Sequence, residues 1–463
     1  MPGRNDKLKS YGRPKDVDIH DFSEDRSPQV LILGFAVIIA LGTLLLMLPI
    51  ATENRVPLDW REALFTATSA VTVTGLIVVS TVERLSTFGE MVVLGLIQVG
   101  GLGFVILSVL FLRLIGRRVA LRERVILRQT MGVHKSHGIL DMAVAVLVVV
   151  LGIEAVGAII LFFTWWDDMG AAQAAYYAMF HSVSAFCNAG FDLFHGTNDP
   201  NLLATRADPV ASLTMATLIT IGTMGITAVF DLLAFPKTKR LSLHTKFILP
   251  LMIAMTVIGT TILLVDELFF SDFLATLPPG ESVLAAFFTV VSARTAGITL
   301  LPIDQLGQAS QLILMVFMFI GGAPASMGGG IGLTTVAVVM VTLWNNVQGH
   351  PDVRIMGRTL PLETIQKAAA IVTVSVGLVL TVTLSILMFD GGQIVPVMFE
   401  VISAFSNTGY SLGITSHLNQ ISRGLIIFTM FWGRLGPLTL VVALAQRTRR
   451  TQVYYPEEKI IIG

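Results

Sequence analysis

Long apolar runs alternate with shorter amphipathic stretches along almost the whole chain. Eight of these runs reach the ~20 residues that a membrane-spanning helix needs, and they lie at about 29–50, 87–115, 139–166, 209–235, 247–268, 306–344, 366–389 and 421–446. Taken in chain order, these eight runs form four successive pairs. Between the two runs of each pair, the spacing of apolar positions predicts a short amphipathic helix, over 58–73, 171–187, 281–293 and 394–406. The pattern therefore predicts four units, each made of a spanning helix, a short helix and a second spanning helix.

A glycine loop with the same local pattern follows each short helix. In chain order, the first to fourth glycine loops are Thr72-Val73-Thr74-Gly75-Leu76, Cys187-Asn188-Ala189-Gly190-Phe191, Arg294-Thr295-Ala296-Gly297-Ile298 and Ser406-Asn407-Thr408-Gly409-Tyr410. Their glycines are separated by 115, 107 and 112 residues. A shared motif at a nearly fixed period indicates an internal repeat.

The residues before the loops strengthen the repeat. In every short helix a phenylalanine precedes a serine by four residues, which places ring and hydroxyl on one helical face; the pairs are Phe65 and Ser69, Phe180 and Ser184, Phe288 and Ser292, and Phe399 and Ser403. The glycine follows the serine by six residues in three units but by five in the third. Perfect fourfold symmetry is therefore not expected. Four similar turns with only a packing role remain an alternative.

The composition is that of an integral membrane protein. Hydrophobic residues make up 54% of the 463 residues and charged residues 13%, with a mean hydropathy of +0.76, whereas soluble domains carry about 25% charged residues. The formal net charge of zero gives no indication of a nucleic-acid partner. The single cysteine excludes an intramolecular disulfide framework, the eight histidines show no metal-ligand spacing, and the polar first 28 residues contain no signal peptide.

The distribution of basic residues predicts the orientation in the cell membrane. Of the 31 lysines and arginines, 24 lie in the terminal segments and in the connections between units. The positive-inside rule then places both termini of this multi-pass protein in the cytoplasm, with the glycine loops opening outward. The expected parts are a cytoplasmic N-terminal segment (1–28), repeat 1 (29–115), a cytoplasmic basic connection (116–138), repeat 2 (139–235), repeat 3 (247–344), repeat 4 (361–446) and a cytoplasmic C-terminal tail (447–463). The basic connection suits either lipid headgroups or a cytoplasmic partner.

Glycine loops at membrane depth indicate an ion pathway. Non-helical backbone is tolerated there only where protein buries it or water lines it, and rings of carbonyl oxygens replace the hydration shell of an ion. Except for Asp192, no carboxylate stands beside the loop glycines, and neutral oxygens suit a weakly hydrated monovalent cation better than Ca²⁺ or Mg²⁺. The predicted selectivity filter binds the cation at the four glycines, and the family resemblance described below implies that this cation is K⁺; the filter consists of Thr72, Val73, Thr74, Gly75, Asn188, Ala189, Gly190, Thr295, Ala296, Gly297, Asn407, Thr408 and Gly409.

A second glycine-rich stretch, the gate segment, interrupts the sixth apolar run at residues 321–332. Its sequence is Gly321-Gly322-Ala323-Pro324-Ala325-Ser326-Met327-Gly328-Gly329-Gly330-Ile331-Gly332. In a helix each glycine costs roughly 1 kcal/mol relative to alanine and proline ~3, so we expect the helix to break here. A merely kinked helix is the alternative. A nucleotide-binding loop is disfavoured because no P-loop lysine follows.

Two arginines lie within the predicted membrane-embedded stretches. Arg434 stands about halfway along the last apolar run, where an arginine costs about 2.5–3.5 kcal/mol on insertion scales. It should therefore face the ion pathway or pair internally, for example with Glu400. The other polar side chains beside the loops are expected to brace them or to pack: Arg294, His181, Asn188 and Asn407.

These motifs resemble those of the Trk/Ktr/HKT superfamily of potassium transporters. The resemblance rests on the four loops, above all the third and the Ser406-Asn407-Thr408-Gly409-Tyr410-Ser411 stretch of the fourth, and covers nearly the whole chain after residue 28. Eight spanning segments are most similar to the Ktr membrane subunit. The resemblance implies an all-α integral membrane protein with four helix–pore-loop–helix repeats around a pseudo-fourfold axis, that is, eight transmembrane helices and four re-entrant half-helices.

The resemblance also implies a function. Members of the family take up K⁺ through a filter with one glycine per loop, and Gly75, where some relatives have serine, implies selectivity for K⁺ over Na⁺. An intramembrane gate is implied for Gly321, Gly322, Ala323, Pro324, Ala325, Ser326, Gly328, Gly329, Gly330 and Arg434. The implied partners are a second copy in a homodimer and a cytoplasmic nucleotide-binding regulatory ring. Dependence of transport on Na⁺ is left open.

Two other classes of function compete with K⁺ transport. A secondary transporter of a small organic solute, with discontinuous helices, would need a roomy midplane pocket with converging polar groups. An intramembrane enzyme would need a nucleophile–base pair or a cluster of metal ligands, and the sequence shows neither. We therefore predict a K⁺ transporter that is not an enzyme and has no organic cofactor in this chain.

Overall fold

Most of the described residues of the computed structural model are helical, which confirms an all-α protein. They comprise 27–103, 139–194, 208–271, 273–350, 352–355 and 357–436. The expected N-terminal segment (apart from residues 27 and 28), the basic connection at 116–138 and the tail at 447–463 lie outside them. Within the described ranges the strands form one antiparallel hairpin, in which β1 (Arg354–Ile355) pairs with β2 (Arg358–Thr359).

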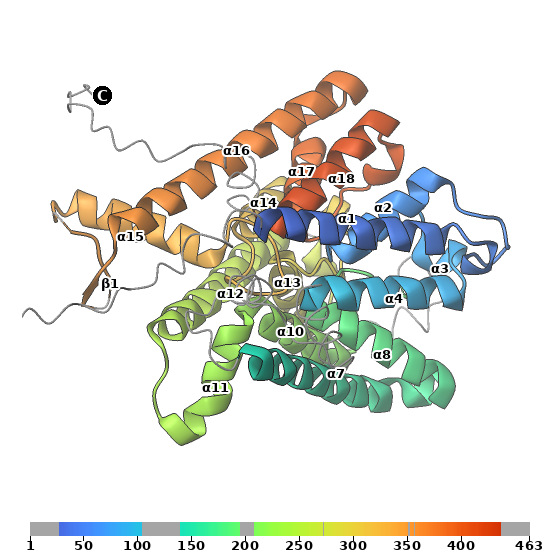
Figure 1. Ribbon diagram of the computed structural model, residues 1–463, viewed down its shortest axis with the longest axis horizontal. Coiled ribbons are helices and arrows are strands. Elements are labelled where there is room, and N and C mark those ends of the chain that lie inside the picture. Colours follow the sequence, from blue (N-terminus) through green and yellow to red (C-terminus); the bar gives the residue numbers. More distant parts are fainter. Residues whose placement is uncertain are drawn as a thin grey trace, which may run out of the picture.

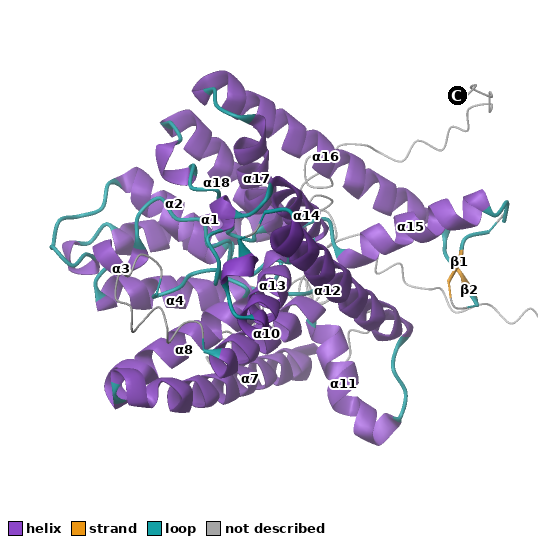
Figure 2. Ribbon diagram, turned by 180° about the vertical axis from the view of Figure 1, so that it is seen from behind, coloured by secondary structure: helices purple, strands orange, loops and turns teal. Residues whose placement is uncertain are grey.

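The helices wind around a common centre (Figures 1 and 2). In chain order they are α1 (Ser27–Leu46), α2 (Trp60–Val71), α3 (Thr81–Arg84), α4 (Thr87–Leu102), α7 (Ile139–Met169), α8 (Ala171–Cys187), α10 (Pro209–Met224), α11 (Ile226–Thr238), α12 (Leu243–Phe269), α13 (Pro279–Ala293), α14 (Gln308–Ile320), α15 (Leu333–Val347), α16 (Leu362–Asp390), α17 (Ile394–Ser406) and α18 (Gln420–Leu435). The short 3₁₀ turns are η3 (Pro49–Ala51), η4 (Leu274–Thr276), η5 (Ile303–Gln305) and η6 (Thr415–His417).

The long helices have the length and hydropathy of membrane spans. Among the described residues, α7 (from Asp141), α12 and α16 are each apolar enough to cross a membrane, and α10 with α11 adds a fourth span if this pair, bent by 105°, is counted as one. Large apolar side chains on α7, α12 and α16 are exposed, for example Val148, Ile253 and Leu380. An exposed apolar surface of this extent fits contact with lipid.

The four short helices α2, α8, α13 and α17 converge on the centre of the molecule (Figure 1). Each packs against the long helix before it and the helix after its loop; the preceding helices are α1, α7, α12 and α16, and the following ones α4, α10, α14 and α18. Each following helix also packs against the next short helix, in the pairs α4 with α8, α10 with α13, α14 with α17, and α18 with α2. The last pair closes the helices into a ring.

Local sequence explains where the short helices begin and end. The carboxylate of Asp59 accepts a hydrogen bond from the Arg61 amide (2.8 Å) and caps the start of α2. Asn188 and Asn407 end α8 and α17 in the left-handed conformation, with φ of 58° and 53°. Asparagine tolerates this conformation better than most residues, so it turns the chain out of the helix directly before the loop glycine.

Glycines in the helices that come after the loops allow close packing against the short helices. A Cβ atom on Gly100, Gly222 or Gly433 would collide with the carbonyl oxygen at the end of a short helix, that of Val71, Phe186 or Phe405. The phenylalanines that the sequence pairs with serines are fully buried behind these contacts. The short helices are therefore held in place by backbone contact as well as by side chains.

Replacing Gly100 by alanine should destabilise the fold, because the added methyl group would overlap the Val71 carbonyl. Overpacking of this kind costs about 1–3 kcal/mol, so we expect a lower thermal unfolding temperature in detergent. Gly95 is the control on the same helix, since a Cβ there meets no described atom within 4 Å. Gly95→Ala should leave the unfolding temperature unchanged or raise it, and equal losses for the two variants would contradict the packing argument.

Candidate functional site

The four glycine loops interlock at the centre of the ring. All four loop glycines have a positive φ: 86° at Gly75, 73° at Gly190, 71° at Gly297 and 94° at Gly409. A Cβ atom on each would collide with the residue before the glycine of the next loop, and the collisions form a cycle: Gly75 with Ala189, Gly190 with Ala296, Gly297 with Thr408, and Gly409 with Thr74. In the first two cases the Cβ position lies 2.6 and 2.8 Å from the carbonyl oxygen. Only glycine permits so close an approach.

The residue before each loop glycine directs its carbonyl away from its own helix. Its amide donates to the carbonyl of the serine that recurs in each short helix, at 2.8 Å for Thr74, Ala189 and Ala296 and 2.9 Å for Thr408. None of the described residues donates a hydrogen bond to these four carbonyl oxygens. Four carbonyl oxygens, one from each loop, thus lie together without a hydrogen-bond donor from the described residues. Carbonyl oxygens arranged in this way can bind a cation.

The serine hydroxyls fasten the loops to the short helices. Ser69 accepts from the amide of Gly75 (3.1 Å), and Ser403 accepts from the amide of Gly409 (3.0 Å). In the other two loops the hydroxyl donates instead to the carbonyl after the glycine, from Ser184 to Phe191 (2.6 Å) and from Ser292 to Ile298 (2.7 Å). The serine that recurs in the sequence therefore has the same structural task in all four units.

The polar side chains of the first and fourth loops form hydrogen bonds behind the backbone. The hydroxyls of Thr72 and Thr74 lie 2.7 Å apart, and Thr74 accepts from Asn407 Nδ2 (2.9 Å). Asn407 thus joins the fourth loop to the first. Asn188 donates instead to the Thr223 hydroxyl on α10 (3.1 Å), so it joins the second loop to a neighbouring helix. These side chains brace the loops, and the backbone oxygens remain for an ion.

The third loop differs from the other three. Two residues before the glycine, the loops have positive φ values of 56° at Val73, 58° at Asn188 and 53° at Asn407, but 142° at Thr295. The third loop has one residue fewer between serine and glycine, so its chain must take a different path to bring Ala296 into the ring. Val73 is β-branched, and such a residue at positive φ is strained, which the surrounding contacts must offset.

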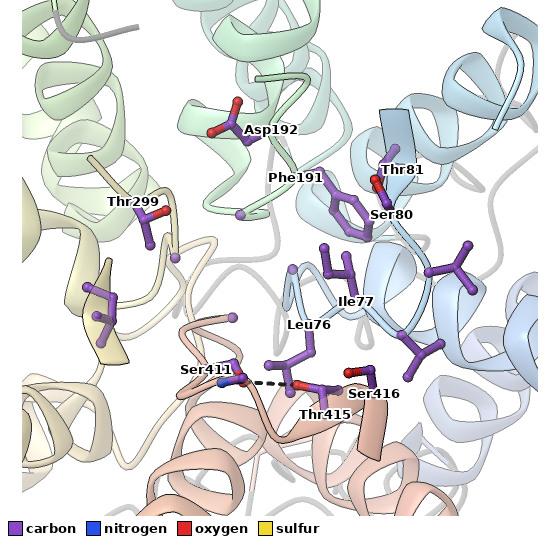
Figure 3. Close-up of a pocket in the computed structure, with 18 of the residues that line it drawn as sticks. Leu76, Ile77, Ser80, Thr81, Phe191, Asp192, Thr299, Ser411, Thr415 and Ser416 are labelled. Carbon is purple, nitrogen blue, oxygen red and sulfur yellow. Dashed lines mark hydrogen bonds between the residues drawn. The ribbon is translucent and has the colours of Figure 1, made fainter. Parts of the chain in front are cut away.

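A cavity of about 530 Å³ opens beside the loops and reaches all four loop glycines (Figure 3). Its lining includes the carboxylates of Glu83, Asp192 and Asp304 and, among the described lining residues, neither lysine nor arginine. The negative charge favours the entry of cations. Glu83 and Asp304 were not identified from the sequence. The scarcity of lysine and arginine near the glycine loops was the available signal that acidic side chains could lie there without basic partners.

Two buried acidic groups support the wall of this cavity. Glu400 accepts hydrogen bonds from the hydroxyls of Ser411 (2.7 Å) and Thr415, and those two side chains lie side by side at the cavity (Figure 3). Asp192 Oδ1 lies 3.0 Å from His181 Nε2. His181 packs edge-on against the ring of Trp165, with the ring centres 5.3 Å apart. The interpretation of His181 as a packing residue fits this environment.

Arg434 does pair internally, but with backbone oxygens, so the sequence-based example of Glu400 as its partner is wrong. Its Nη1 donates to the Met327 carbonyl in the gate segment, and its Nη2 donates to the carbonyls of Gly100 and Gly101 (3.2 Å to the latter) at the end of α4. Among the described residues no carboxylate forms an ion pair with it. Arg294 is also buried, and its Nε and Nη1 have no hydrogen-bond partner among the described residues.

The gate segment folds back on itself between α14 and α15. The Gly322 amide donates to the Gly329 carbonyl (3.2 Å), and the Leu333 amide donates to the Gly322 carbonyl (2.8 Å). Two of its glycines lie against filter side chains, because a Cβ on Gly328 or Gly329 would collide with Thr295 or Asn407. The structure thus brings the predicted gate residues into contact with the third and fourth loops.

The remaining chemistry of the described residues offers no competing metal site. No group of three histidine, cysteine, aspartate or glutamate side chains in these ranges is arranged to hold a metal ion. Neutral oxygens without a carboxylate suit a monovalent ion.

Comparison with known proteins finds a family and close relatives. The model of the TrkH family, described as "Cation transport protein", matches residues 29–451. The Ktr system potassium uptake protein B of Bacillus subtilis (strain 168) is 33% identical over 94% of this chain and 96% of its own, and that of Vibrio alginolyticus is 34% identical over 96% of each. The potassium/sodium uptake protein NtpJ of Enterococcus hirae is 31% identical over 94% of this chain and 97% of its own.

A solved structure shares the fold. The crystal structure of the potassium transporter TrkH from Vibrio parahaemolyticus superposes with a TM-score of 0.72, covering 92% of this chain and 86% of that one at 19% identity. At this identity the likeness concerns the fold alone.

Binding of a cation to the loop carbonyls should stabilise the protein. Ligand at about 100 times its dissociation constant adds roughly 2.7 kcal/mol, so we expect K⁺ or Rb⁺ to raise the thermal unfolding temperature above that in Li⁺ or choline. Gly409→Ala should abolish the difference, because its Cβ would displace the Thr74 carbonyl. Gly413→Ala is the control, since Gly413 also has a positive φ (84°) but no described atom within 4 Å of a Cβ. Equal unfolding temperatures in K⁺ and Li⁺ would contradict cation binding here.

Proposed function

The chain belongs to the TrkH family of cation transport proteins, and on that basis we propose that it takes up K⁺ across the cell membrane through the ring of four glycine loops. One observation carries the proposal: the carbonyls of Thr74, Ala189, Ala296 and Thr408 form a ring without hydrogen-bond donors from the described residues. The relatives named above as potassium uptake proteins support K⁺ as the ion.

Selectivity arises from the geometry of the ring. A dehydrated K⁺ recovers the lost water contacts from carbonyl dipoles, provided that the oxygens are held at the right spacing. The interlocked glycines and the serine anchors fix that spacing, and the hydrogen bond between Asn407 and Thr74 prevents the first and fourth loops from separating. The acidic cavity faces the cell exterior and concentrates cations in front of the ring.

Inward movement is driven by the membrane potential. A potential of 100 mV, negative inside, contributes ~2.3 kcal/mol per elementary charge. The Enterococcus relative is named a potassium/sodium uptake protein, and that name supports a part for Na⁺ in transport here as well.

The gate segment closes the pathway on the inner side of the ring. It lies against the third and fourth loops through Gly328 and Gly329, and Arg434 holds it by the Met327 carbonyl. The guanidinium adds a positive charge that opposes the passage of a cation, because little water screens it there. Opening then requires the gate segment to leave the ring and the arginine to exchange its partners.

The chain is organised as four repeats around a pseudo-fourfold axis, with the boundaries that the sequence predicts. The ring of contacts between each following helix and the next short helix supports this arrangement. Both termini lie in the cytoplasm, as the distribution of basic residues indicates. The protein acts as a homodimer with a cytoplasmic nucleotide-binding regulatory ring, and the relatives named as parts of a Ktr system support additional subunits.

Gly75→Ser should reduce the discrimination of K⁺ over Na⁺. Its Cβ would push the Ala189 carbonyl out of the ring, and a loss of about 1.4 kcal/mol of preferential binding corresponds to a tenfold loss of selectivity. The measurement is uptake of radioactive Rb⁺ into liposomes, competed by K⁺ or Na⁺. Gly391→Ser, at a positive φ of 71° with no described atom near its Cβ, should compete as the unchanged protein does. Unaltered competition in Gly75→Ser would refute the filter assignment, and uptake of an organic solute in place of Rb⁺ would favour a secondary transporter.

Removal of residues 323–330 should raise Rb⁺ uptake and weaken control by a regulatory subunit, because the pathway loses its obstruction. Arg434→Gln should act in the same direction, since it removes both the hydrogen bond to Met327 and the positive charge. Arg423→Gln on the same helix is the control, as Arg423 is partly buried but donates to the Ser416 carbonyl (2.7 Å), away from the gate segment. Reduced uptake by a folded deletion variant would show that the segment is structural.

A further inference from the structure

The helix after the second loop is interrupted in a way that concerns the gate segment. Helix α10 ends at Met224 and α11 starts at Ile226, with a bend of 105° between them at Gly225. The last carbonyls of one helix and the first amides of the next have no partners within their own helices. At membrane depth such groups must be satisfied by another part of the protein.

The gate segment supplies these partners. The Ala323 amide donates to the Thr223 carbonyl (2.9 Å), and the Met327 amide donates to the Gly222 carbonyl (3.1 Å). In the other direction, the Ile226 amide donates to the Ala325 carbonyl (3.2 Å). Three backbone hydrogen bonds thus seat the tip of the gate segment in the gap between α10 and α11.

Contacts on the side of the ring are of a different kind. There the gate segment presents Gly328 and Gly329 to the side chains of Thr295 and Asn407. The oxygens Thr295 Oγ1 and Asn407 Oδ1 are buried and have no hydrogen-bond partner among the described residues. Apolar Cα–H groups facing acceptor oxygens make at best weak contacts. The gate segment is therefore fastened to the second unit and only rests against the third and fourth loops.

This asymmetry indicates how the gate segment moves. We propose, on the basis of the proposed function, that the α10–α11 interruption is the pivot of the gate, and that Gly225 is a positioning residue for it. The segment swings away from the third and fourth loops while its hydrogen bonds to Gly222, Thr223 and Ile226 stay intact. Arg434 is the latch on the opposite side, released first.

Helix α11 connects this pivot to the surface of the protein. Its far end leads into an exposed basic turn with Lys237, Lys239 and Arg240. Asp231 on α11 accepts hydrogen bonds from the Thr245 hydroxyl (2.6 Å) and the Ser242 amide (3.2 Å), which fasten the helix to the start of α12. A displacement of the turn is therefore transmitted along α11 to the residues that seat the gate segment.

The role of Gly225 can be tested because the chain contains a second glycine with nearly the same backbone conformation. Gly225 has φ 87° and ψ 142°, and a Cβ there would lie 2.6 Å from the Pro324 carbonyl oxygen of the gate segment. Gly103, at the end of α4, has nearly the same backbone, with φ 81° and ψ 127°, but no described atom within 4 Å of its Cβ. The two glycine-to-alanine substitutions impose the same backbone strain, and only the one at Gly225 pushes the gate segment off its seat.

Uptake of radioactive Rb⁺ into liposomes measures the effect. Gly225→Ala should raise uptake roughly fivefold, because a shifted seat moves Met327 away from Arg434 and weakens the latch by about one hydrogen bond, whereas Gly103→Ala should change it little. Equal effects of the two substitutions would attribute the change to backbone strain and overturn the role of Gly225. No change in either would overturn it as well.

A tether tests the pivot directly, even if Gly225→Ala does not fold. Cysteines are introduced by Ile226→Cys and Ala325→Cys in a Cys187→Ser background, because Cys187 is the only native cysteine, and closure of the disulfide is verified by loss of free thiols. With the pivot tethered, Rb⁺ uptake should persist, and Arg434→Gln should still raise it.

The outcomes separate the pivot from the proposed gate. If closing the disulfide abolishes uptake or the response to Arg434→Gln, and reduction restores it, the gate segment must leave α10 and α11 altogether. The pivot is then wrong, while the gate assignment stands. If instead the variant lacking residues 323–330 transports Rb⁺ as the full chain does, the gate itself is wrong and the pivot falls with it.

Discussion

Backbone groups that leave a helix inside the membrane need partners within the protein, because lipid offers none. This requirement accounts for most of the polar contacts at the centre of the molecule. The amides of the loops are bound by serines, the ends of the interrupted helix α10–α11 are bound by the gate segment, and the carbonyls at the end of α4 are bound by Arg434. The four loop carbonyls remain without donors from the described residues. A buried polar group left unpaired costs about 1–3 kcal/mol, so a cation bound by these four carbonyls, as proposed, would offset part of that cost.

Arg434 is suited to its position by the shape of its side chain. The guanidinium is a planar fork with several donors, and it reaches carbonyls of the gate segment and of α4 at the same time. One side chain thereby joins the helix after the first loop to the segment that follows α14. Because its partners are carbonyl dipoles, its positive charge is less compensated than it would be beside a carboxylate. In the proposed mechanism that charge would therefore act on a cation in the ring more strongly than the charge of an ion pair would.

The sequence predicted the elements of the centre better than it predicted how they meet. The expected short helix at 171–187 is α8, and that at 394–406 is α17, because amphipathic spacing and the following glycine both mark them. The missing residue in the third loop correctly indicated a different path, seen in the φ of Thr295. The partners of Arg434 and Asn188 could not be found in this way. Both side chains bind groups on distant helices, and two of the three oxygens that Arg434 binds belong to glycines, whose carbonyls leave no trace in side-chain spacing.

The cyclic contact of the loop glycines has a consequence for how such a ring can evolve. In an assembly of identical subunits every substitution in a loop would appear on all sides at once, and the ring would be altered everywhere or nowhere. Here one chain supplies all four sides, so each can drift independently as long as it still fits its two neighbours. The shortened third loop, whose neighbour Gly328 belongs to the gate segment, is an asymmetry that only this covalent arrangement permits. Division of labour among the sides thus follows from gathering them in a single polypeptide.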